Sequence, residues 1–432
     1  MQQAYSWSWI ESQVAQTIEV WDGSATRTPR AAPQYSPQEQ TRREQAYDRA
    51  LHDVDREAKA PTPPTRAAHI AKQNRMTASF ARFSAEALDL KGDAVELLTG
   101  DFLPVGTRLA RWARRFDPSL TMPDIIQACR NAWTACGLQP LMGEPIGLTP
   151  SILGYSMLYP YTDNFLDQAD ISAATKHHFS ARFRERLSGG AISPLNRHEC
   201  ALWELVGLVE GQYPRTLYPG VFDCMLAIHR AQEESLAQLR SEPRPDEVLR
   251  MSCAKGGSSV LADACLARGW LSPQESQFGF EWGVLLQLGD DLQDVREDLL
   301  RGSTTLFSRT AAAGTPLDSL AAQLLSFSDA VADRMDALPH GNSMLKELLR
   351  MSWRSLIVGG IADSHQFFTP GFLAEMERTS PFRFAFLRAR RELLASREGL
   401  YTTLFHAFLE HPEDDDTGPT LPAPALAASG CA

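Results

Sequence analysis

Two stretches of the sequence place acidic residues at helical spacing within largely apolar segments. In YPYTDNFLDQAD (residues 159–170), Asp163, Asp167 and Asp170 recur every three or four positions. In LLQLGDDLQDVREDLLRGSTTLF (285–307), one stripe holds Gln287, Asp291, Asp294 and Asp298, with Asp290 at its edge. Carboxylates that share a helix face repel one another, so a pattern that appears twice indicates a bound cation. Oxygen ligands without accompanying histidine or cysteine indicate a hard ion such as Mg²⁺.

A simpler interpretation of acids at helical spacing is a solvent-exposed helix face. The neighbouring residues argue against it in both stretches. Asp163 stands among three tyrosines and Phe165, and the Asp290–Asp291 pair directly follows the apolar run WGVLLQLG. Neither set therefore lies on an obviously polar helix, and the sequence favours a functional role for both.

Helix signals cover almost the whole region between residues 95 and 410. Thr149-Pro150 is an N-cap followed by a first-turn proline, and it predicts a helix that continues through Asp170. Ser272-Pro273-Gln274-Glu275 combines a capping box with a first-turn proline, and it predicts an unbroken helix to Arg301-Gly302. Alternating runs of β-branched residues between turn dipeptides are absent from the sequence. We therefore expect an all-α domain over residues 95–410.

Both ends of the chain are rich in proline and polar residues. Residues 1–65 contain TRTPRAAPQYSPQEQ and KAPTPPT on either side of a charged helical stretch. We expect them to form a flexible N-terminal extension that contributes little to the bundle. Residues 412–432, which read PEDDDTGPTLPAPALAASGCA, have low-complexity character, and we expect a disordered tail there.

At the two acidic stretches the sequence resembles the class I isoprenoid (terpenoid) synthase superfamily, helical bundles that use Mg²⁺ to handle prenyl diphosphates. DNFLD looks like the superfamily's first aspartate-rich motif, reduced to DxxxD. LQLGDDLQDV is similar to the FQxxDDxxD motif of chain-elongating prenyltransferases, and LQDVREDLLRGSTTLF is similar to the LRDVxEDxxRGxxYLP stretch of phytoene and squalene synthases. The resemblance implies an all-α, class I terpenoid synthase-like helical bundle with a central active-site cavity.

The resemblance also implies which side chains would handle the metal and the diphosphate. Three Mg²⁺ ions would bind two groups of carboxylates, which are Asp163 and Asp167 in the first motif and Asp290, Asp291, Asp294 and Asp298 in the second. Of these, Asp163, Asp167 and Asp294 are the expected catalytic residues. Metal ions and basic side chains would stabilise the charge that develops on the departing diphosphate.

Basic residues that could bind the diphosphate are expected next to the acids. Lys255 precedes Gly256-Gly257, a pair that weakens a helix and would let its backbone approach a ligand. Arg301 is seven residues beyond Asp294 and shares its stripe, and Arg250 is a weaker candidate. For Lys255 the alternative is an ordinary solvent-exposed lysine.

The remaining candidates for substrate binding are polar or aromatic. Gln287 lies on the same stripe as the second set of acids, and Tyr159 and Phe165 carry rings whose faces can attract a carbocation. For each ring the alternative is plain packing in the core. The sequence nominates no dedicated base for the proton that a carbocation must lose.

The sequence favours some reactions of the superfamily over others. Asn164 replaces the second aspartate of the elongating motif, which disfavours chain elongation. Lys255 in CAKGGSS departs from the YxxVAGxVG pattern of head-to-head synthases. We therefore expect a Mg²⁺-dependent terpene synthase, a lyase that converts one prenyl diphosphate into a cyclic or rearranged terpene and releases pyrophosphate. A head-to-head prenyltransferase of the squalene or phytoene synthase type and a non-catalytic helical scaffold stay open as alternatives.

Composition disfavours several other classes of protein. The net charge of −11 argues against a nucleic-acid partner, because counterion release needs a basic surface. No uncharged apolar run approaches the roughly 20 residues of a membrane span, and MQQAYSWSWIESQ lacks the features of a signal peptide. The 7 cysteines form no CxxC pair and are expected to be reduced, which favours a cytoplasmic location. A homodimer is left open.

Overall fold

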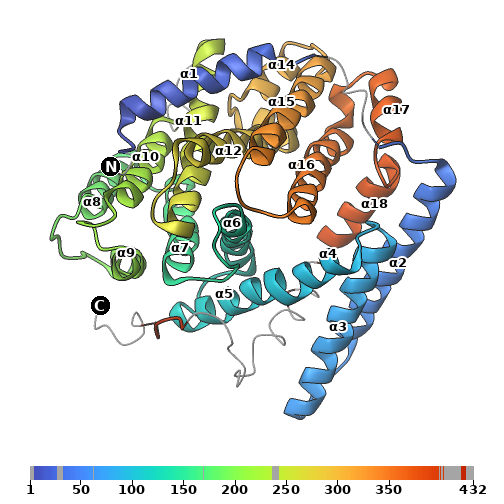
Figure 1. Cartoon of the computed structure of the whole chain (residues 1–432), viewed down its shortest axis with the longest axis horizontal. Coiled ribbons are helices and arrows are strands. Elements are labelled where there is room, and N and C mark those ends of the chain that lie inside the picture. Colours follow the sequence, from blue (N-terminus) through green and yellow to red (C-terminus); the bar gives the residue numbers. More distant parts are fainter. Residues whose placement is uncertain are drawn as a thin grey trace.

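The computed structural model describes residues 4–26, 33–61, 63–168, 170–235, 243–397 and 420–424, together with 399 and 402. Every regular element among these residues is a helix, so the all-α prediction is confirmed. Most of the helices pack around one continuous hydrophobic core (Figure 1).

The first ten elements are α1 (Trp7–Gly23), α2 (Pro37–Lys59), α3 (Arg66–Glu86), α4 (Gly92–Glu96), the π-helix η1 (Leu97–Phe102), α5 (Leu103–Phe116), α6 (Met122–Leu141), α7 (Pro150–Asp167), α8 (Ala173–Leu187) and α9 (Arg197–Gln212). They are followed by α10 (Pro219–Ser235), α11 (Pro245–Arg268), α12 (Pro273–Gln293), α13 (Val295–Arg301), α14 (Leu306–Ala312), α15 (Asp318–Asp336), α16 (Ser343–Asp363), the 3₁₀-helix η3 (His365–Phe367), α17 (Pro370–Arg378) and α18 (Phe384–Ala395).

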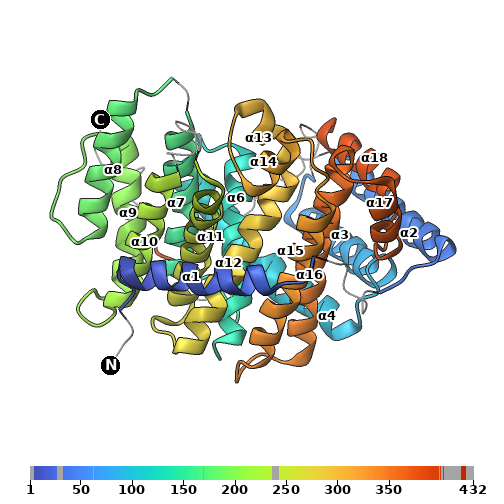
Figure 2. The same ribbon diagram turned by 90° about the horizontal axis from the view of Figure 1, so that it is seen from above.

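Helices α11 and α12 form the centre of the fold. Helix α11 packs against α10 and α12, and α12 also packs against α15 and α16. On the other side of α11, helix α6 contacts both α11 and α7, and α7 packs against α9. Figure 2 shows these helices running side by side, so that α6, α7, α10, α11 and α12 surround the middle of the bundle.

The starts of the two helices with acidic ends agree with the sequence-based prediction. Thr149 caps α7, because its side chain accepts a hydrogen bond from the backbone N–H of Ile152. Ser272 and Glu275 form the capping box of α12. Such caps satisfy N–H groups that have no partner within the helix, which is why a short local pattern fixes the first residue.

Both helices end earlier than predicted. Helix α7 ends at Asp167, so Asp170 lies in an exposed turn beyond it and not on the helix face. The helix expected to continue unbroken to Arg301 ends at Gln293 instead. Asp294 adopts φ −93° and ψ 6°, outside helical geometry, and α13 starts at the next residue. Asp298 and Arg301 therefore belong to a separate short helix.

Helix α1 packs across the central helices, in contact with α11, α12 and α15 (Figure 2). Its residues Ile10, Val14 and Trp21 share one face and are almost completely buried in the main core. Just before it, the hydroxyl oxygens of Tyr5 and Ser276 lie 2.8 Å apart. The structure therefore differs from the expectation that residues 1–65 contribute little to the bundle. Helix α1 has an apolar face, but the many polar residues of this segment made that pattern hard to recognise in the sequence.

Helices α2 and α3 pair with each other and form a second, smaller core together with residues around the start of α18 (Figure 1). The buried residues of this small core are Ala46, Ala87 and Phe382. Across it, Glu44 is ion-paired with Arg383, and Asp48 with Arg390 at 2.6 Å. Segments on both sides of residue 95 thus build one cluster, and the boundary expected near residue 95 does not separate them.

The cysteines agree only in part with the expectation that all are reduced. Five are buried free thiols, namely Cys129, Cys136, Cys224, Cys253 and Cys265. Cys200 is disulfide-bonded, so the expectation is wrong for this residue. The cysteine pattern therefore lends less support to a cytoplasmic location than the sequence analysis supposed.

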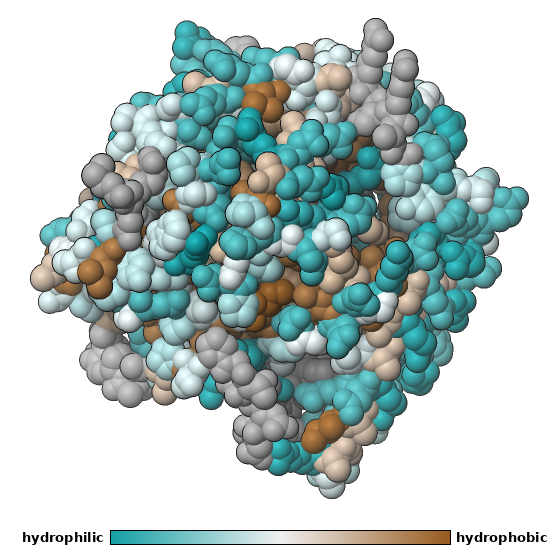
Figure 3. Space-filling model, viewed as in Figure 1, coloured by the Kyte–Doolittle hydropathy of each residue, from teal (hydrophilic) through white to brown (hydrophobic). Residues whose placement is uncertain are grey.

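The surface is mainly polar on the face drawn in Figure 3, where hydrophilic residues predominate and apolar residues gather in a band near the middle. Within the described residues, no helix combines the length and the apolar character needed to cross a membrane.

A very close approach between α11 and α12 occurs at two glycines. A Cβ on Gly256 would lie 2.5 Å from the carbonyl oxygen of Gly283, and a Cβ on Gly283 would lie 2.0 Å from the carbonyl oxygen of Gly256. A Cβ on Gly257 would lie 2.4 Å from the ring of Phe280. From the sequence, Gly256-Gly257 were predicted to weaken the helix and to let its backbone approach a ligand. Helix α11 is instead continuous there, and its glycines allow α12 to pack against it.

We expect Gly283→Ala to destabilise the protein by about 3 kcal/mol, because the added methyl group fits only if the two backbones move apart. Chemical denaturation would measure the free energy of unfolding. Gly207→Ala on α9 is a matched control, since a Cβ there meets nothing within 4 Å and alanine favours a helix over glycine. Equal stability of the two variants would contradict the role assigned to the glycine contact.

Candidate functional site

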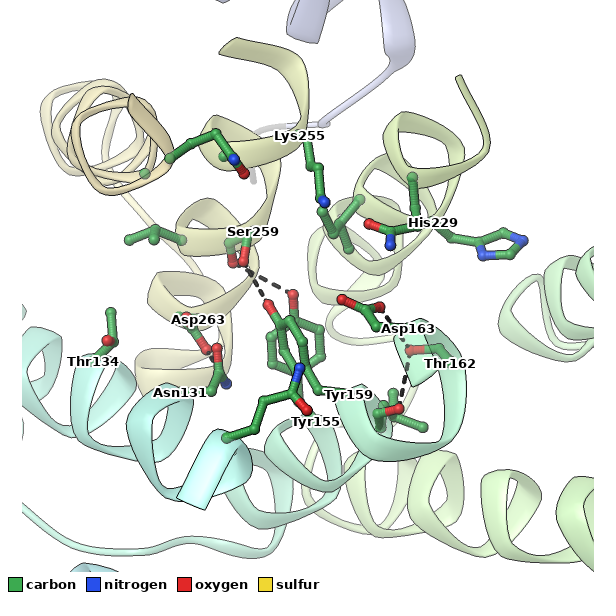
Figure 4. Close-up of a pocket in the computed structure, with 18 of the residues that line it drawn as sticks. Asn131, Thr134, Tyr155, Tyr159, Thr162, Asp163, His229, Lys255, Ser259 and Asp263 are labelled. Carbon is green, nitrogen blue, oxygen red and sulfur yellow. Dashed lines mark hydrogen bonds between the residues drawn. The ribbon is translucent and has the colours of Figure 1, made fainter. Parts of the chain in front are cut away.

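A partly open cavity of about 400 Å³ lies among the central helices. Side chains from α6, α7, α8, α10, α11 and α12 line it. Much of the wall is apolar, with contributions from Leu158, Leu166, Phe183, Met225, Ile228, Val260 and Leu286. Figure 4 shows the polar residues that line it, which come from helices on several sides.

Acids from both predicted stretches line this cavity. Asp163 comes from the last turns of α7, and Asp290 and Asp294 come from the end of α12. The hydroxyl of Thr162 donates a hydrogen bond to Asp163 Oδ1 at 3.2 Å. Burial raises the pKa of Asp290 and of Asp294 above the usual carboxyl range. The structure thus brings residues of two stretches more than a hundred positions apart to the same cavity.

Two basic side chains lie near these acids. Lys255 of α11 lines the cavity and points into it (Figure 4). Arg130 of α6 lies 3.7 Å from Asp290, measured from Nη2 to Oδ1, and this guanidinium opposes the effect of burial on the pKa of Asp290. Both partners are about half exposed, so the pair contributes little to stability and leaves Arg130 free to bind another anion.

Further polar groups line the more deeply buried part of the cavity (Figure 4). The hydroxyl oxygens of Tyr159 and Ser259 lie 2.6 Å apart, and the hydroxyl of Tyr155 donates to the backbone carbonyl of Ser259 at 3.4 Å. Asn131 Nδ2 donates to Asp263 Oδ1 at 3.0 Å. Burial raises the pKa of Asp263 well above its usual range, which favours the neutral form of this carboxyl group.

Asp291 differs from its neighbour Asp290, because its side chain is buried between α11 and α12 and does not line the cavity. Ser252 Oγ donates to Asp291 Oδ2 at 3.0 Å, and Gln287 Nε2 donates to Oδ1 at 2.8 Å. Burial raises the pKa of Asp291 to about 7. Gln287 itself lines the cavity, as expected for a substrate-binding residue, but one of its amide hydrogens is used to hold Asp291.

Asp298 and Arg301 lie on α13 and are not among the residues that line the cavity. Thr305 Oγ1 donates to Asp298 Oδ2 at 3.3 Å, and burial raises the pKa of Asp298 to about 6. The side chain of Arg301 is 73% exposed and is ion-paired with Glu297 at 3.2 Å. The end of α12 at Gln293 thus removes both residues from the stripe on which the sequence placed them.

The other expected residues also lie apart from the cavity lining. Arg250 lines a smaller pocket between α1 and α11. Phe165 packs against Phe179 and His198, with ring centroids 4.7 and 4.8 Å away. Asp167 is the last residue of α7, and its side chain falls outside the described part of the structure, so its role stays a prediction.

The sequence analysis missed Arg130, Asn131 and Asp263. Arg130 and Asn131 are adjacent polar residues within the otherwise small and apolar stretch QACRNAWTAC, and Asp263 is the one charge in VLADACLA. A polar residue alone in an apolar helical stretch is the signal that could have found them, because such a group must meet a partner or a cavity when the helix is buried.

Comparisons with known proteins do not identify a family for this chain. No protein-family model matches the sequence, and no curated protein matches it significantly.

We expect Asp291→Asn to flatten the pH dependence of stability in metal-free protein. Burial raises the pKa of Asp291 to about 7 in the folded state, whereas an aspartate in the unfolded chain titrates near pH 4. Between these values the folded protein holds a proton that the unfolded chain has lost. The free energy of unfolding therefore falls as the pH rises from about 4 to about 7, by as much as about 4 kcal/mol.

Denaturation in EDTA at several pH values across this window would measure the effect. Asp170→Asn, the same change in an exposed turn, is the control and should follow the wild-type curve. If Asp291→Asn also runs parallel to the wild-type curve, the assignment of the titrating group is wrong.

Proposed function

We propose that the protein is a Mg²⁺-dependent class I terpene synthase that ionises one prenyl diphosphate and forms a cyclic or rearranged terpene with release of pyrophosphate. The observation that carries the proposal is that Asp163, Asp290, Asp294 and Lys255 line the same cavity as apolar side chains such as Leu158, Ile228 and Val260. A ligand with a charged head and a hydrocarbon chain matches both parts. The volume of about 400 Å³ lies toward the lower end for small-molecule sites, which supports one prenyl chain over two.

The donor atoms at the acidic end suit Mg²⁺, since they are carboxylate oxygens. No three acidic, histidine or cysteine side chains among the described residues are placed to hold an ion on their own. Asp163 on one side and Asp290 and Asp294 on the other would therefore each supply a few ligands, and oxygens of the diphosphate and of water would complete the coordination. When bound, Mg²⁺ supplies Lewis-acid stabilisation of the charge on the leaving diphosphate.

The protein's own side chains have separate tasks in this proposal. Lys255 and Arg130 would bind diphosphate oxygens and hold the scissile end of the substrate beside the acids. The apolar wall, with Leu158 and Ile228 among its members, would exclude water from the hydrocarbon chain. The ring of Tyr159 lines the same space and could stabilise a carbocation by a cation–π contact.

A second candidate function is a helical scaffold that binds such a ligand without converting it. The observation that favours it is that the described acids form no group able to hold a metal ion alone. In this case the acidic end would bind the ligand through Lys255 and Arg130, and Mg²⁺ would not accelerate release of pyrophosphate.

Incubation of the full chain with prenyl diphosphates of different lengths, singly and in pairs, tests the proposal. A terpene synthase should release pyrophosphate only when Mg²⁺ is present and should give terpenes with as many carbons as the substrate. Mass spectrometry of the extract would identify them. Products with twice the carbons would instead support the head-to-head alternative, and the absence of Mg²⁺-dependent pyrophosphate release would support the scaffold.

We expect Asp163→Asn and Asp294→Asn each to lower Mg²⁺-dependent pyrophosphate release by about a hundredfold or more, because each removes a charged ligand from the metal-binding end. Their melting temperatures should be unchanged or slightly raised, since each substitution removes a carboxylate that is repelled by its neighbours in the metal-free protein. Asp170→Asn is the control, because it makes the same substitution at a residue outside the cavity lining. Loss of stability with retained activity would contradict the assignment.

We expect Lys255→Ala to weaken binding of pyrophosphate in the presence of Mg²⁺ by about tenfold, because a charge-assisted contact is lost. Arg301→Ala, although it removes a nearby positive charge, should change the affinity by less than about twofold, since that side chain is exposed and outside the cavity lining. Isothermal titration calorimetry would measure both. If Arg301→Ala weakens pyrophosphate binding more than Lys255→Ala does, Arg301 belongs to the binding site and Lys255 does not.

A further inference from the structure

The buried part of the central cavity contains a carboxyl oxygen that has no hydrogen-bond partner among the described residues. Asp263 of α11 lines the cavity and is only 1% exposed. Asn131 Nδ2 donates to its Oδ1 at 3.0 Å, whereas its Oδ2 is buried and unpartnered within the described chain. Asn131 also donates to Ser156 Oγ at 3.1 Å, so its amide is held in place from two sides.

An unpartnered polar oxygen at this depth is costly, and native structures contain few of them. Burial raises the pKa of Asp263 well above its usual range, and the hydrogen bond from Asn131 opposes this shift only in part. This shift favours the protonated form of the carboxyl group. Because Oδ1 accepts from Asn131, the acidic hydrogen belongs on Oδ2, where the group becomes a hydrogen-bond donor toward the cavity.

The polar neighbours of Asp263 are already engaged with one another. Tyr159 pairs with Ser259 at 2.6 Å, and Tyr155 donates to the Ser259 carbonyl at 3.4 Å. Neither pair places an acceptor at Asp263 Oδ2, so a ligand oxygen could fill that position. Asp263 follows Lys255 by eight residues on one helix, so the two Cα atoms are separated by roughly 12 Å along its axis.

We propose that Asp263, positioned by Asn131, forms an oxygen-binding subsite at the buried end of the cavity, which recognises a hydroxyl, carbonyl or ether oxygen, or a water molecule, beside the hydrocarbon chain. The subsite deepens the proposed function and rests on it for the identity of the charged end of the ligand. The oxygen has two sources with the same chemistry: the substrate's own chain, or a water that ends the reaction.

If water is the source, its oxygen forms a C–O bond with the carbocation, and the oxonium ion that results gives up a proton to the released pyrophosphate. The product is then a terpene alcohol, and Asp263 keeps its own proton throughout as a hydrogen-bond donor. If the substrate is the source, the same donor binds an oxygen that is already on the chain.

A binding experiment without metal or diphosphate tests the subsite separately from the proposed function. The probes are 2-tridecanone and 1-tridecene, which have the same chain length but differ in a carbonyl oxygen. Displacement of a fluorescent fatty-acid probe would give both affinities. Wild-type protein should bind the ketone about tenfold more tightly than the alkene. This is the difference expected when a buried donor forms a hydrogen bond with one ligand and has no partner with the other.

Two variants show whether that preference comes from Asp263. Asp263→Ala should reduce it to about twofold or less, because the donor is gone. Asp263→Asn should retain it, since its amide can donate to the ligand while its oxygen still accepts from Asn131. The two probes also differ in hydrophobicity, but this difference affects every variant equally. It therefore cancels when the ratio of the two affinities is compared between variants. Equal binding of ketone and alkene by the wild type, or an unchanged preference in Asp263→Ala, would overturn the proposal.

Incubation of prenyl diphosphates in ¹⁸O-labelled water distinguishes the two sources. An alcohol that carries the label identifies water, and faster conversion of diphosphates with an oxygen on the chain identifies the substrate. Products and rates that Asp263→Ala leaves unaltered would overturn the subsite. If the protein converts no diphosphate, the proposed function fails, and the ketone measurement still decides whether the subsite exists.

Discussion

The contact between α11 and α12 at Gly256 and Gly283 fixes the geometry on which the candidate site depends. Each glycine lies against the other's carbonyl oxygen, so a side chain at either position would force the two backbones apart. Lys255 directly precedes this contact, and Asp290 follows it two turns later on α12. The hydrogen bond from Ser252 to Asp291, at 3.0 Å, fixes the register of the same crossing. Asp290 and Lys255 therefore stand on the two central helices and not on loops.

This crossing also explains why adjacent aspartates have different environments. Asp291 faces the interface between the two helices, where Ser252 and Gln287 donate to both of its oxygens. Asp290, one residue earlier and about 100° away around the helix, faces the cavity and Arg130. A helical stripe read from the sequence assigns both residues to metal binding. Only the position of the neighbouring helix shows that Asp291 satisfies its hydrogen bonds within the protein.

The sequence predicted the features that depend on local patterns. The starts of α7 and α12 follow from their caps, and of the two acidic stretches Asp163, Asp290 and Asp294 line one cavity. The end of α12 was not predictable in this way, because Asp294 leaves helical geometry without a glycine or proline to signal it. Contacts between distant residues were equally hidden: Asn131 and Asp263 are 132 positions apart, and Trp21 packs on Phe327.

Asp290 and Asp263 both line the cavity, but their neighbours affect the two carboxyl groups differently. Burial raises the pKa of Asp290, but Arg130 and Lys255 oppose the shift, and a metal ion would oppose it further. Asp263 has only the neutral amide of Asn131 to oppose the effect of burial on its pKa, so its uncharged form is favoured. Negative charge is thus favoured at Asp290, where a cluster of cations could balance it. It is disfavoured at Asp263, where a carbocation would be enclosed. A carbocation formed on the chain would then meet rings and dipoles at the buried end, with no anion there to trap it.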